Sequence, residues 1–382
     1  MADQPHDLDW LKGALQSAVA LEHSTLPLYL AAMFSLRTQS FTAYNLVRSV
    51  VMEEMVHMSI ACNTLAALGG SPQIRHLDPG FPSKGLPGGA EPDLDAWLAQ
   101  LSRPQLQAFM RVELPEFLMP DEFRDESYPT IANLYDAIDS AIDANAGAVR
   151  EAMKETAGSP TRANQVGDNI GFSTIVYVEG EDPIPQLHAG IHEILEQGEG
   201  ASSRTLHADA GSEGEESHYC KFAELYYGGR YEEPDPPVEL TRATEPEFFK
   251  GYKIPFPDVV NTLAVPSDGY TAILAEDPNA QAAEGALQAF DAAYSDVLSK
   301  LDDVWNGPAA QSWPTLGAAV GGMGGLRVPA CFKVMVEQVP PAAIAKLPEL
   351  YPDEHERMAA LTDLDRPVFY GPRFKNVNAA AA

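Results

Sequence analysis

The sequence has few of the features that mark a secreted, disulfide-bonded or membrane-spanning chain. Its three cysteines, Cys62, Cys220 and Cys331, lack paired spacing, which excludes a disulfide framework. Its start, MADQPHDLDW, has no basic segment followed by an apolar one, so we see no secretory signal. No run of about 18 or more apolar residues is present, which excludes a helix that spans a bilayer. We therefore expect a cytoplasmic protein with no membrane partner.

Basic residues are also scarce. Lys and Arg number 25 against 55 Asp and Glu, which gives a formal net charge of −30. Nucleic acids and anionic membrane surfaces bind basic patches, so this balance argues against either as a partner. Apolar residues make up 45% of the 382 residues, enough for a sizeable core in one large domain or two of ordinary size.

The chain does contain a carboxylate and an imidazole inside an apolar helical run. The stretch 50–63, VVMEEMVHMSIACN, carries Glu54 and His57 at a Glu-x-x-His spacing. Positions i and i+3 share one face of an α-helix, and here that face also holds Val50 and Ala61. A carboxylate and an imidazole that turn toward a core have to be paired, neutralised or bound to a metal.

A second acidic group is expected at the same depth. Residues 7–36 form a long amphipathic helix with Glu22 in its apolar stripe, and residues 38–68 form the helix of Glu54. The turn near 37–40 lies about fifteen residues after Glu22 and about fifteen before Glu54. At about 1.5 Å rise per residue, the two side chains lie at one level of an antiparallel helix pair.

A second Glu-x-x-His lies later in the chain. Residues 212–227 are predicted as a helix that carries Glu215 and His218. The alternative for Glu215 is a capping box with Ser212, in which the carboxylate only fixes the helix start.

The helix expected over 183–200 leaves the choice of ligand open. His188, His192, Glu196 and Glu199 fall on one side of it, beside its apolar face. The helical wheel places Glu199 and His192 nearer that face, whereas a helix end or a π-bulge at the following glycine turns Glu196 inward. Histidines such as His188 and His192 are more often surface or core residues than ligands.

Proline- and glycine-rich segments separate these helices. The run RVELPEFLMP places Glu113 and Glu116 around a proline, where we expect a loop edge. We divide the chain into a metal-binding bundle with inserted loops and helices, residues 1–230, and a Pro-rich segment with a helical extension packed on that bundle, residues 231–382. Further helices are expected over 94–108, 131–156, 282–305 and 315–338.

Two Glu-x-x-His helices and two further helices that each give a Glu are the ligand pattern of ferritin-like di-metal bundles. Carboxylates and imidazoles suit iron or manganese with open positions, whereas zinc prefers fewer ligands. We therefore predict an all-α protein with a ferritin-like four-helix bundle, Pro/Gly-rich loops and a C-terminal helical extension. The expected cofactor is two iron ions, with manganese as an alternative.

Several segments resemble the ferritin-like domain of the iminophenylpyruvate dimer synthase family, which includes the violacein- and rebeccamycin-pathway chromopyrrolate-type synthases. These segments are LEHSTLPLYLAAMFS, EEMVHMSIACNTLAALGGSP, EQGEG, SHYCKF, RVELPE and FYGPRF. The chain is a shorter, stand-alone version, and the pair His188 and His192 departs from the family pattern, so both stay in reserve with Glu199. The resemblance implies a di-iron-type centre with the ligands Glu22, Glu54, His57, Glu196, Glu215 and His218.

We expect a di-iron enzyme that uses O₂ to oxidise a small, amino-acid-derived metabolite in specialised metabolism. Two alternatives stay open: a metal-binding or storage protein of the same fold without turnover, and a partner-binding scaffold with a degenerate site. The sequence leaves the substrate, the electron donor and the oligomeric state open, a homodimer included.

Overall fold

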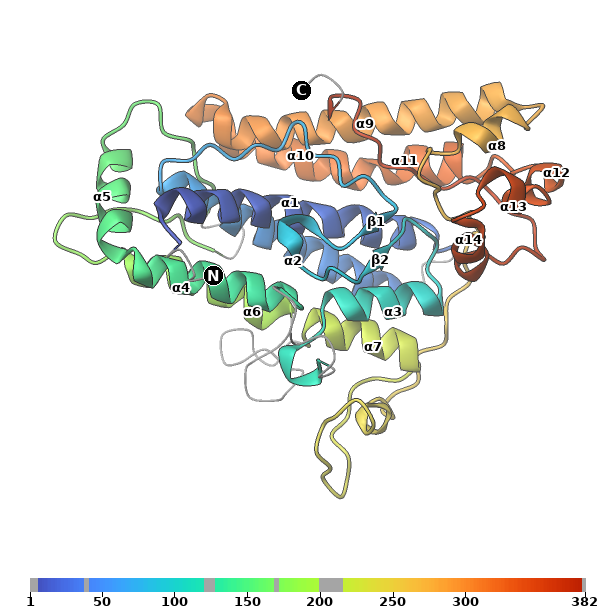
Figure 1. Ribbon diagram of the computed structural model, residues 1–382, viewed down its shortest axis with the longest axis horizontal. Coiled ribbons are helices and arrows are strands. Elements are labelled where there is room, and N and C mark those ends of the chain that lie inside the picture. Colours follow the sequence, from blue (N-terminus) through green and yellow to red (C-terminus); the bar gives the residue numbers. More distant parts are fainter. Residues whose placement is uncertain (1–5, 38–40, 120–127, 168–171, 199–215, 380–382) are drawn as a thin grey trace.

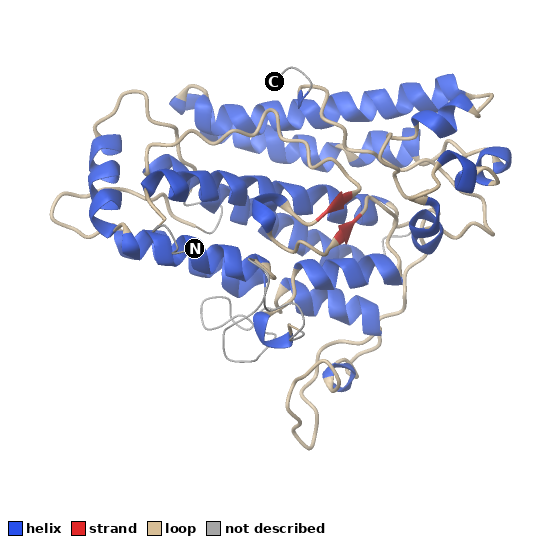
Figure 2. Ribbon diagram, viewed as in Figure 1, coloured by secondary structure: helices blue, strands red, loops and turns tan. Residues whose placement is uncertain are grey.

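The computed structural model describes residues 6–37, 41–119, 128–167, 172–198 and 216–379. The described chain is mostly helical (Figure 2), and its two-stranded ribbon pairs β1 (Ser83–Lys84) antiparallel with β2 (Asp95–Ala96). The predicted all-α class is therefore confirmed. Among the described helices, none combines the length and the apolar character needed to cross a bilayer.

The centre of the molecule is the helix pair α1 (Leu8–Phe34) and α2 (Phe41–Ala67). The Asp7 side chain caps α1 by accepting a hydrogen bond of 2.8 Å from the backbone N–H of Trp10. All residues of α1 from Leu21 to Phe34 are buried. A helix buried all round lies inside a protein rather than on its surface, so α1 is the core of the bundle.

Below this pair, in the view of Figure 1, lie two shorter helix pairs. One consists of α4 (Ile131–Ala144) and α6 (Ile184–Gly198), and the other of α3 (Arg103–Val112) and α7 (His218–Tyr227). Helix α4 packs on α1, while α6 and α7 pack on α2. The second layer of the bundle is therefore built from helices that end near the middle of the molecule.

Several predicted helices differ from the observed ones. The helix expected over 315–338 is divided into α10 (Ser312–Gly325), α11 (Arg327–Pro329) and the π-helix Ala330–Val334. The helix expected over 131–156 is divided at Asn145 into α4 and α5 (Ala146–Ala157). The Asn145 amide donates to the carbonyl oxygens of Ala141 and His6, at 2.8 and 2.6 Å, and such side-chain bonds compete with the helical backbone. The helix expected over 94–108 begins later, as α3, because the Ser102 hydroxyl caps it there.

The C-terminal residues add the pair α9 (Ala280–Asn306) and α10 (Ser312–Gly325), which lies above α1 in Figure 1. Tyr294 of α9 hydrogen-bonds His23 of α1 at 2.7 Å, and the Trp305 indole donates to Asn63 of α2 at 3.1 Å. These buried polar contacts tie the extension to the central pair. The remaining short elements are η1 (Pro87–Gly89), η2 (Glu116–Leu118), η4 (Glu245–Phe248), α8 (Thr271–Ala275), η5 (Ala309–Gln311), α11 (Arg327–Pro329), the π-helix Ala330–Val334, α12 (Pro341–Ile344), α13 (Leu347–Leu350) and α14 (His355–Leu361).

Candidate metal centre

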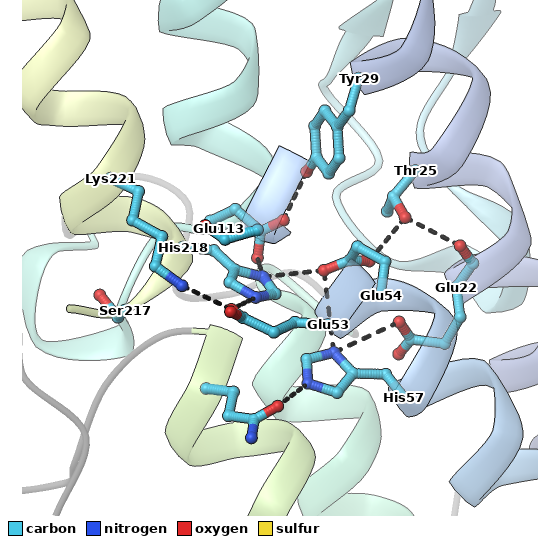
Figure 3. Close-up of polar contacts among 12 residues, drawn as sticks. Glu22, Thr25, Tyr29, Glu53, Glu54, His57, Glu113, Ser217, His218 and Lys221 are labelled. Atoms are coloured by element: carbon cyan, nitrogen blue, oxygen red, sulfur yellow. Dashed lines mark hydrogen bonds and ion pairs between the residues drawn. The ribbon is translucent and has the colours of Figure 1, made fainter. Parts of the chain in front are cut away.

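Buried carboxylates and histidines meet where the helices of the second layer end (Figure 3). Glu22 comes from α1, and Glu54 and His57 come from α2. Glu113 is the C-cap of α3, and His218 is the first residue of α7. All five side chains are at most 4% exposed. Burial of this degree is rare for ionisable groups unless they are paired or bind a metal.

Glu54 is the centre of this cluster. Its Oε1 atom lies 2.8 Å from Nδ1 of His218 and 3.7 Å from Nδ1 of His57. Nδ1 of His57 is also 3.8 Å from Oε2 of Glu22, and Nδ1 of His218 is 3.5 Å from Oε2 of Glu113. Each histidine therefore faces the shared Glu54 and one outer carboxylate, which gives the cluster two similar halves.

The other nitrogen of each histidine contacts an acceptor outside the cluster. Nε2 of His57 lies 2.9 Å from Oε1 of Gln197, whose amide nitrogen donates to Glu193 and so turns the oxygen toward the ring. Nε2 of His218 lies 2.8 Å from Oε2 of Glu53. Because both partners accept, Nε2 of each ring carries a proton, and Nδ1 is the nitrogen that faces the cluster. Outer acceptors of this kind fix metal-binding histidines in the same way.

A hydroxyl group orients each of the three carboxylates. In every case the hydroxyl contacts one carboxylate oxygen, and the other oxygen faces the histidines. The carboxylates are therefore presented to a common centre. The pairs are Tyr135 with Glu22, Tyr29 with Glu113, and Thr25 with Glu54 at 2.6 Å.

The cluster holds three buried carboxylates close together, so their ionised forms repel one another and are poorly solvated. Burial and then the charge of Glu54 raise the pKa of Glu22 well above 4.5, and the same two causes raise that of Glu113. Burial also acts to raise the pKa of Glu54, but the close approach and the charge of His218 outweigh it and the pKa falls below 4.5.

The two histidines respond differently. Burial lowers the pKa of His57 to about 4. Burial acts on His218 in the same direction, but the carboxylates of Glu113, Glu53 and Glu54 outweigh it and raise the pKa well above 6.5. Without a metal, the cluster therefore takes up protons to balance its acids.

These residues fit a metal ion. Glu54, His57 and His218 offer ligand atoms that all lie within 4.8 Å of one another. Nδ1 of His218 is buried and has no hydrogen-bond partner in the described part of the chain, because Glu54, although close, does not approach it in a hydrogen-bonding direction. A cation bound there would satisfy this atom and replace the protons. Carboxylate oxygens with imidazole nitrogens suit iron and manganese.

A small cavity adjoins the cluster. Its volume is about 20 Å³, and its lining includes Glu22, Glu54, His57 and Glu113. That volume holds about one water-sized molecule. Apolar side chains and a tyrosine from α4 and α6 form the opposite wall: Ile131, Ala132, Tyr135, Ile194 and Leu195.

The structure brings together part of the predicted ligand set. Glu215, and the reserve residue Glu199, lie outside the described residues. Helix α7 begins at His218, and its N-cap Ser217 accepts a hydrogen bond from Cys220, so the observed start of this helix is not the capping box considered for Glu215. The predicted residues that meet in the cluster are Glu22, Glu54, His57 and His218.

Helix α6 contributes a different residue from the one expected. Glu196 is half-buried and, within the described chain, makes no hydrogen bond or ion pair with the cluster, whereas the next residue, Gln197, contacts His57. His188 instead pairs with Asp139 at 2.5 Å, and the His192 side chain is 60% exposed. Neither reserve histidine of α6 reaches the cluster.

Glu113 is the cluster residue that sequence reasoning missed. The backbone N–H of Glu113 donates to the carbonyl oxygen of Phe109 in α3, as in a helix, and Pro115 two residues later prevents the helix from continuing. The carboxylate therefore turns inward at a helix end instead of lying on a loop edge. The one signal in the sequence was its place between two apolar residues, Val112 and Leu114, which are both 1% exposed.

Fold and cluster together define a helical-bundle protein with a buried carboxylate–histidine cluster whose ligand atoms are compatible with a bound metal ion. The ferritin-like family model matches residues 15–227, more than half of the chain, and the chain belongs to the ferritin-like family. A crystal structure of a ferritin-like protein from Caulobacter vibrioides is similar in fold, with a TM-score of 0.56 at 19% sequence identity, over 85% of this chain and 94% of that one. No curated protein matches the chain.

Proposed function

We propose that the cluster holds two divalent transition-metal ions, iron in the first place and manganese as the alternative, and that the protein uses them to oxidise a small molecule with O₂. The observation that carries the proposal is the pair of histidines that direct Nδ1 toward one shared carboxylate, Glu54. Glu22 and His57 would hold one ion, Glu113 and His218 the other, and Glu54 both. The bound pair would supply an O₂-binding position and two electrons, one from each ion.

The chain's own groups prepare the site for that chemistry. The hydroxyls of Tyr135 and Tyr29 hold the outer carboxylates of Glu22 and Glu113 in place, which limits their rearrangement when charge changes. The apolar wall of α4 and α6 keeps bulk water from the reacting atoms. A cavity of about 20 Å³ accommodates O₂ but not an amino acid, so an organic substrate has to displace side chains of that wall.

An amino-acid-derived substrate is supported by the resemblance of the segments around Glu22 and Glu54 to the iminophenylpyruvate dimer synthase family. We place the reaction in the cytoplasm, in specialised metabolism. The same small cavity favours a second candidate, a metal-binding protein of this fold without turnover.

Metal loading tests the cluster. Full-length protein is reconstituted anaerobically with Fe(II) or Mn(II), and the bound metal is measured by elemental analysis. We expect about two ions per chain, falling to one or fewer in His57→Ala and in His218→Ala. His188→Ala is the matched control, because that histidine pairs with Asp139 away from the cluster. Only trace metal in the wild type, or an equal loss of bound metal in His188→Ala, would contradict the proposed metal site.

The choice between Glu113 and Glu196 of α6, and the reaction itself, need separate tests. Glu113→Gln should lower metal content while Glu196→Gln does not; the reverse would return the ligand to α6. For the reaction, O₂ uptake by the Fe(II)-loaded protein is followed with each amino acid and its 2-oxo acid. Acceleration by any of them, with product, supports an oxidase. O₂ uptake that depends only on added Fe(II), together with the binding of many iron ions per chain, supports a storage protein instead.

A further inference from the structure

A second pocket lies away from the cluster, at the end of the molecule where Figure 1 shows α5. It has a volume of about 470 Å³. Its walls come from the C-terminal end of α2, from α5, from residues 162–165 and 174–177, and from the start of α10. Ala66 and Ala67 of α2 lie about nine or ten residues beyond His57, which at about 1.5 Å per residue separates the pocket from the cluster by roughly 14 Å.

The charge of this pocket differs from that of the chain. Asp and Glu outnumber Lys and Arg by 55 to 25 in the sequence, yet the described residues that line the pocket include no acid and one base, Arg162. Arg162 is exposed at the rim and forms no ion pair within the described chain. A strongly acidic protein thus presents a local position for an anion.

The lining also has uncommitted hydroxyl groups. Ser312 is 5% exposed, and its Oγ atom is buried without a hydrogen-bond partner among the described residues. The hydroxyls of Thr156, Thr174 and Tyr177, which line the same pocket, also lack a hydrogen-bond partner in the described part of the chain. These last three side chains are half-buried and accessible to water, whereas buried polar groups are nearly always satisfied, so the unpartnered Oγ of Ser312 indicates a missing water or ligand.

The walls are held in place by other side chains. Both amide atoms of Gln165 bond to the backbone of Ile175, at 2.9 and 2.7 Å. The Asn164 amide donates to the carbonyl oxygens of Val304 and Gly307, at 3.2 and 2.8 Å. The pocket is therefore a formed site, with two of its polar residues used as structure and the hydroxyls left for a ligand.

We propose that this pocket binds a small organic carboxylate. The carboxylate pairs with Arg162 at the rim, and the apolar body lies over Ala66, Met153 and Ile175, which are buried in the floor. A single arginine suits one negative charge, and the aliphatic side chains among the lining suit a short hydrocarbon body beside it. The site does not depend on the metal cluster or on the function proposed for it.

Binding is measured by titration calorimetry on the full-length protein with 4-phenylbutyrate and octanoate as probes, beside the neutral 4-phenylbutyramide. We expect dissociation constants of about 0.1–1 mM for the acids and at least about tenfold weaker binding of the amide, since charge-assisted bonds are stronger than neutral ones. Arg162→Gln should weaken the acids by about tenfold, and Ala309→Trp, at an exposed lining position, should abolish binding.

Two control variants test whether binding depends on this pocket alone. Lys154→Gln removes one positive charge from α5 outside the lining, and His57→Ala disables the cluster; neither should change the affinity. If circular dichroism shows that Ala309→Trp does not fold, the affinities of Arg162→Gln and Ser312→Ala for the two acids test the pocket in its place. No binding of either acid up to about 10 mM, equal binding of acid and amide, insensitivity to Arg162→Gln, or loss of binding in His57→Ala would each overturn the proposal.

Discussion

Glu22→Gln should stabilise the metal-free protein while it removes one of the proposed metal ligands. The Glu22 carboxyl is 2% exposed, and burial, followed by the charge of Glu54, raises its pKa well above 4.5. Glutamine has nearly the shape of the protonated acid. Its oxygen can still accept from the Tyr135 hydroxyl, which donates to Glu22 in the wild type. The substitution therefore removes a buried ionisable group without leaving a hole.

The size of the effect follows from proton linkage. In the unfolded chain the group titrates near 4.5. Between that pH and its raised folded pKa, the native state binds more protons than the unfolded state, so wild-type stability falls as pH rises. At about 1.4 kcal/mol per pH unit, the penalty at pH 7 is at most about 3.5 kcal/mol, and it vanishes well below pH 4.5, where both states are protonated. Metal reverses the order, because ligand at about 1,000 times its dissociation constant stabilises the wild type by about 4 kcal/mol, which exceeds this penalty.

The assay is urea unfolding, followed by circular dichroism at pH 5 and pH 7.5, with a chelator and then with Mn(II). In chelator, Glu22→Gln should exceed the wild type by about 1–3 kcal/mol at pH 7.5 and by much less at pH 5. In Mn(II) it should be the less stable protein. Glu196→Gln is the matched control and should show neither difference. A variant that is less stable than the wild type in chelator at pH 7.5, or a gain that does not change with pH, would refute the electrostatic reasoning.

Three further outcomes are expected. Gln197→Leu removes the acceptor of the His57 Nε2–H and should weaken metal binding by about tenfold in a chelator competition, while the helical circular dichroism signal stays intact. An unchanged metal affinity would contradict the positioning role of Gln197. Asn63→Ala should cost about 2–4 kcal/mol in urea unfolding, because it strands the buried Trp305 N–H and the backbone of residue 166, and a loss below about 1 kcal/mol would count against this. Burial acts to lower the pKa of His188, but the acids beside it outweigh this and raise the pKa. The His188 ion pairs therefore contribute about 0.5–1 kcal/mol to the free energy of unfolding below pH 6.5, and this contribution is lost as pH rises through the folded pKa. The stability difference between wild type and His188→Gln should shrink from pH 5.5 to pH 9.

The helices of the central pair, and the depth at which their cluster residues lie, follow from the sequence alone. The pattern that places Glu22, Glu54 and His57 inside apolar stripes depends only on the 3.6-residue period. Their common level depends only on the helical rise and on the position of the turn between the helices. Both are local properties, and the structure brings Nδ1 of His57 within 3.8 Å of Oε2 of Glu22.

The other half of the cluster depends on tertiary contacts. There the side chains come from helix ends, where one residue more or less turns a side chain in or out and where the period gives no guidance. Glu113 faces the cluster because α3 stops before Pro115 and meets the start of α7, and Gln197 rather than Glu196 contacts His57 because of how the end of α6 packs on α2. Helix ends are positioned by contacts between segments that are far apart in the chain, and no local pattern in the sequence encodes those contacts.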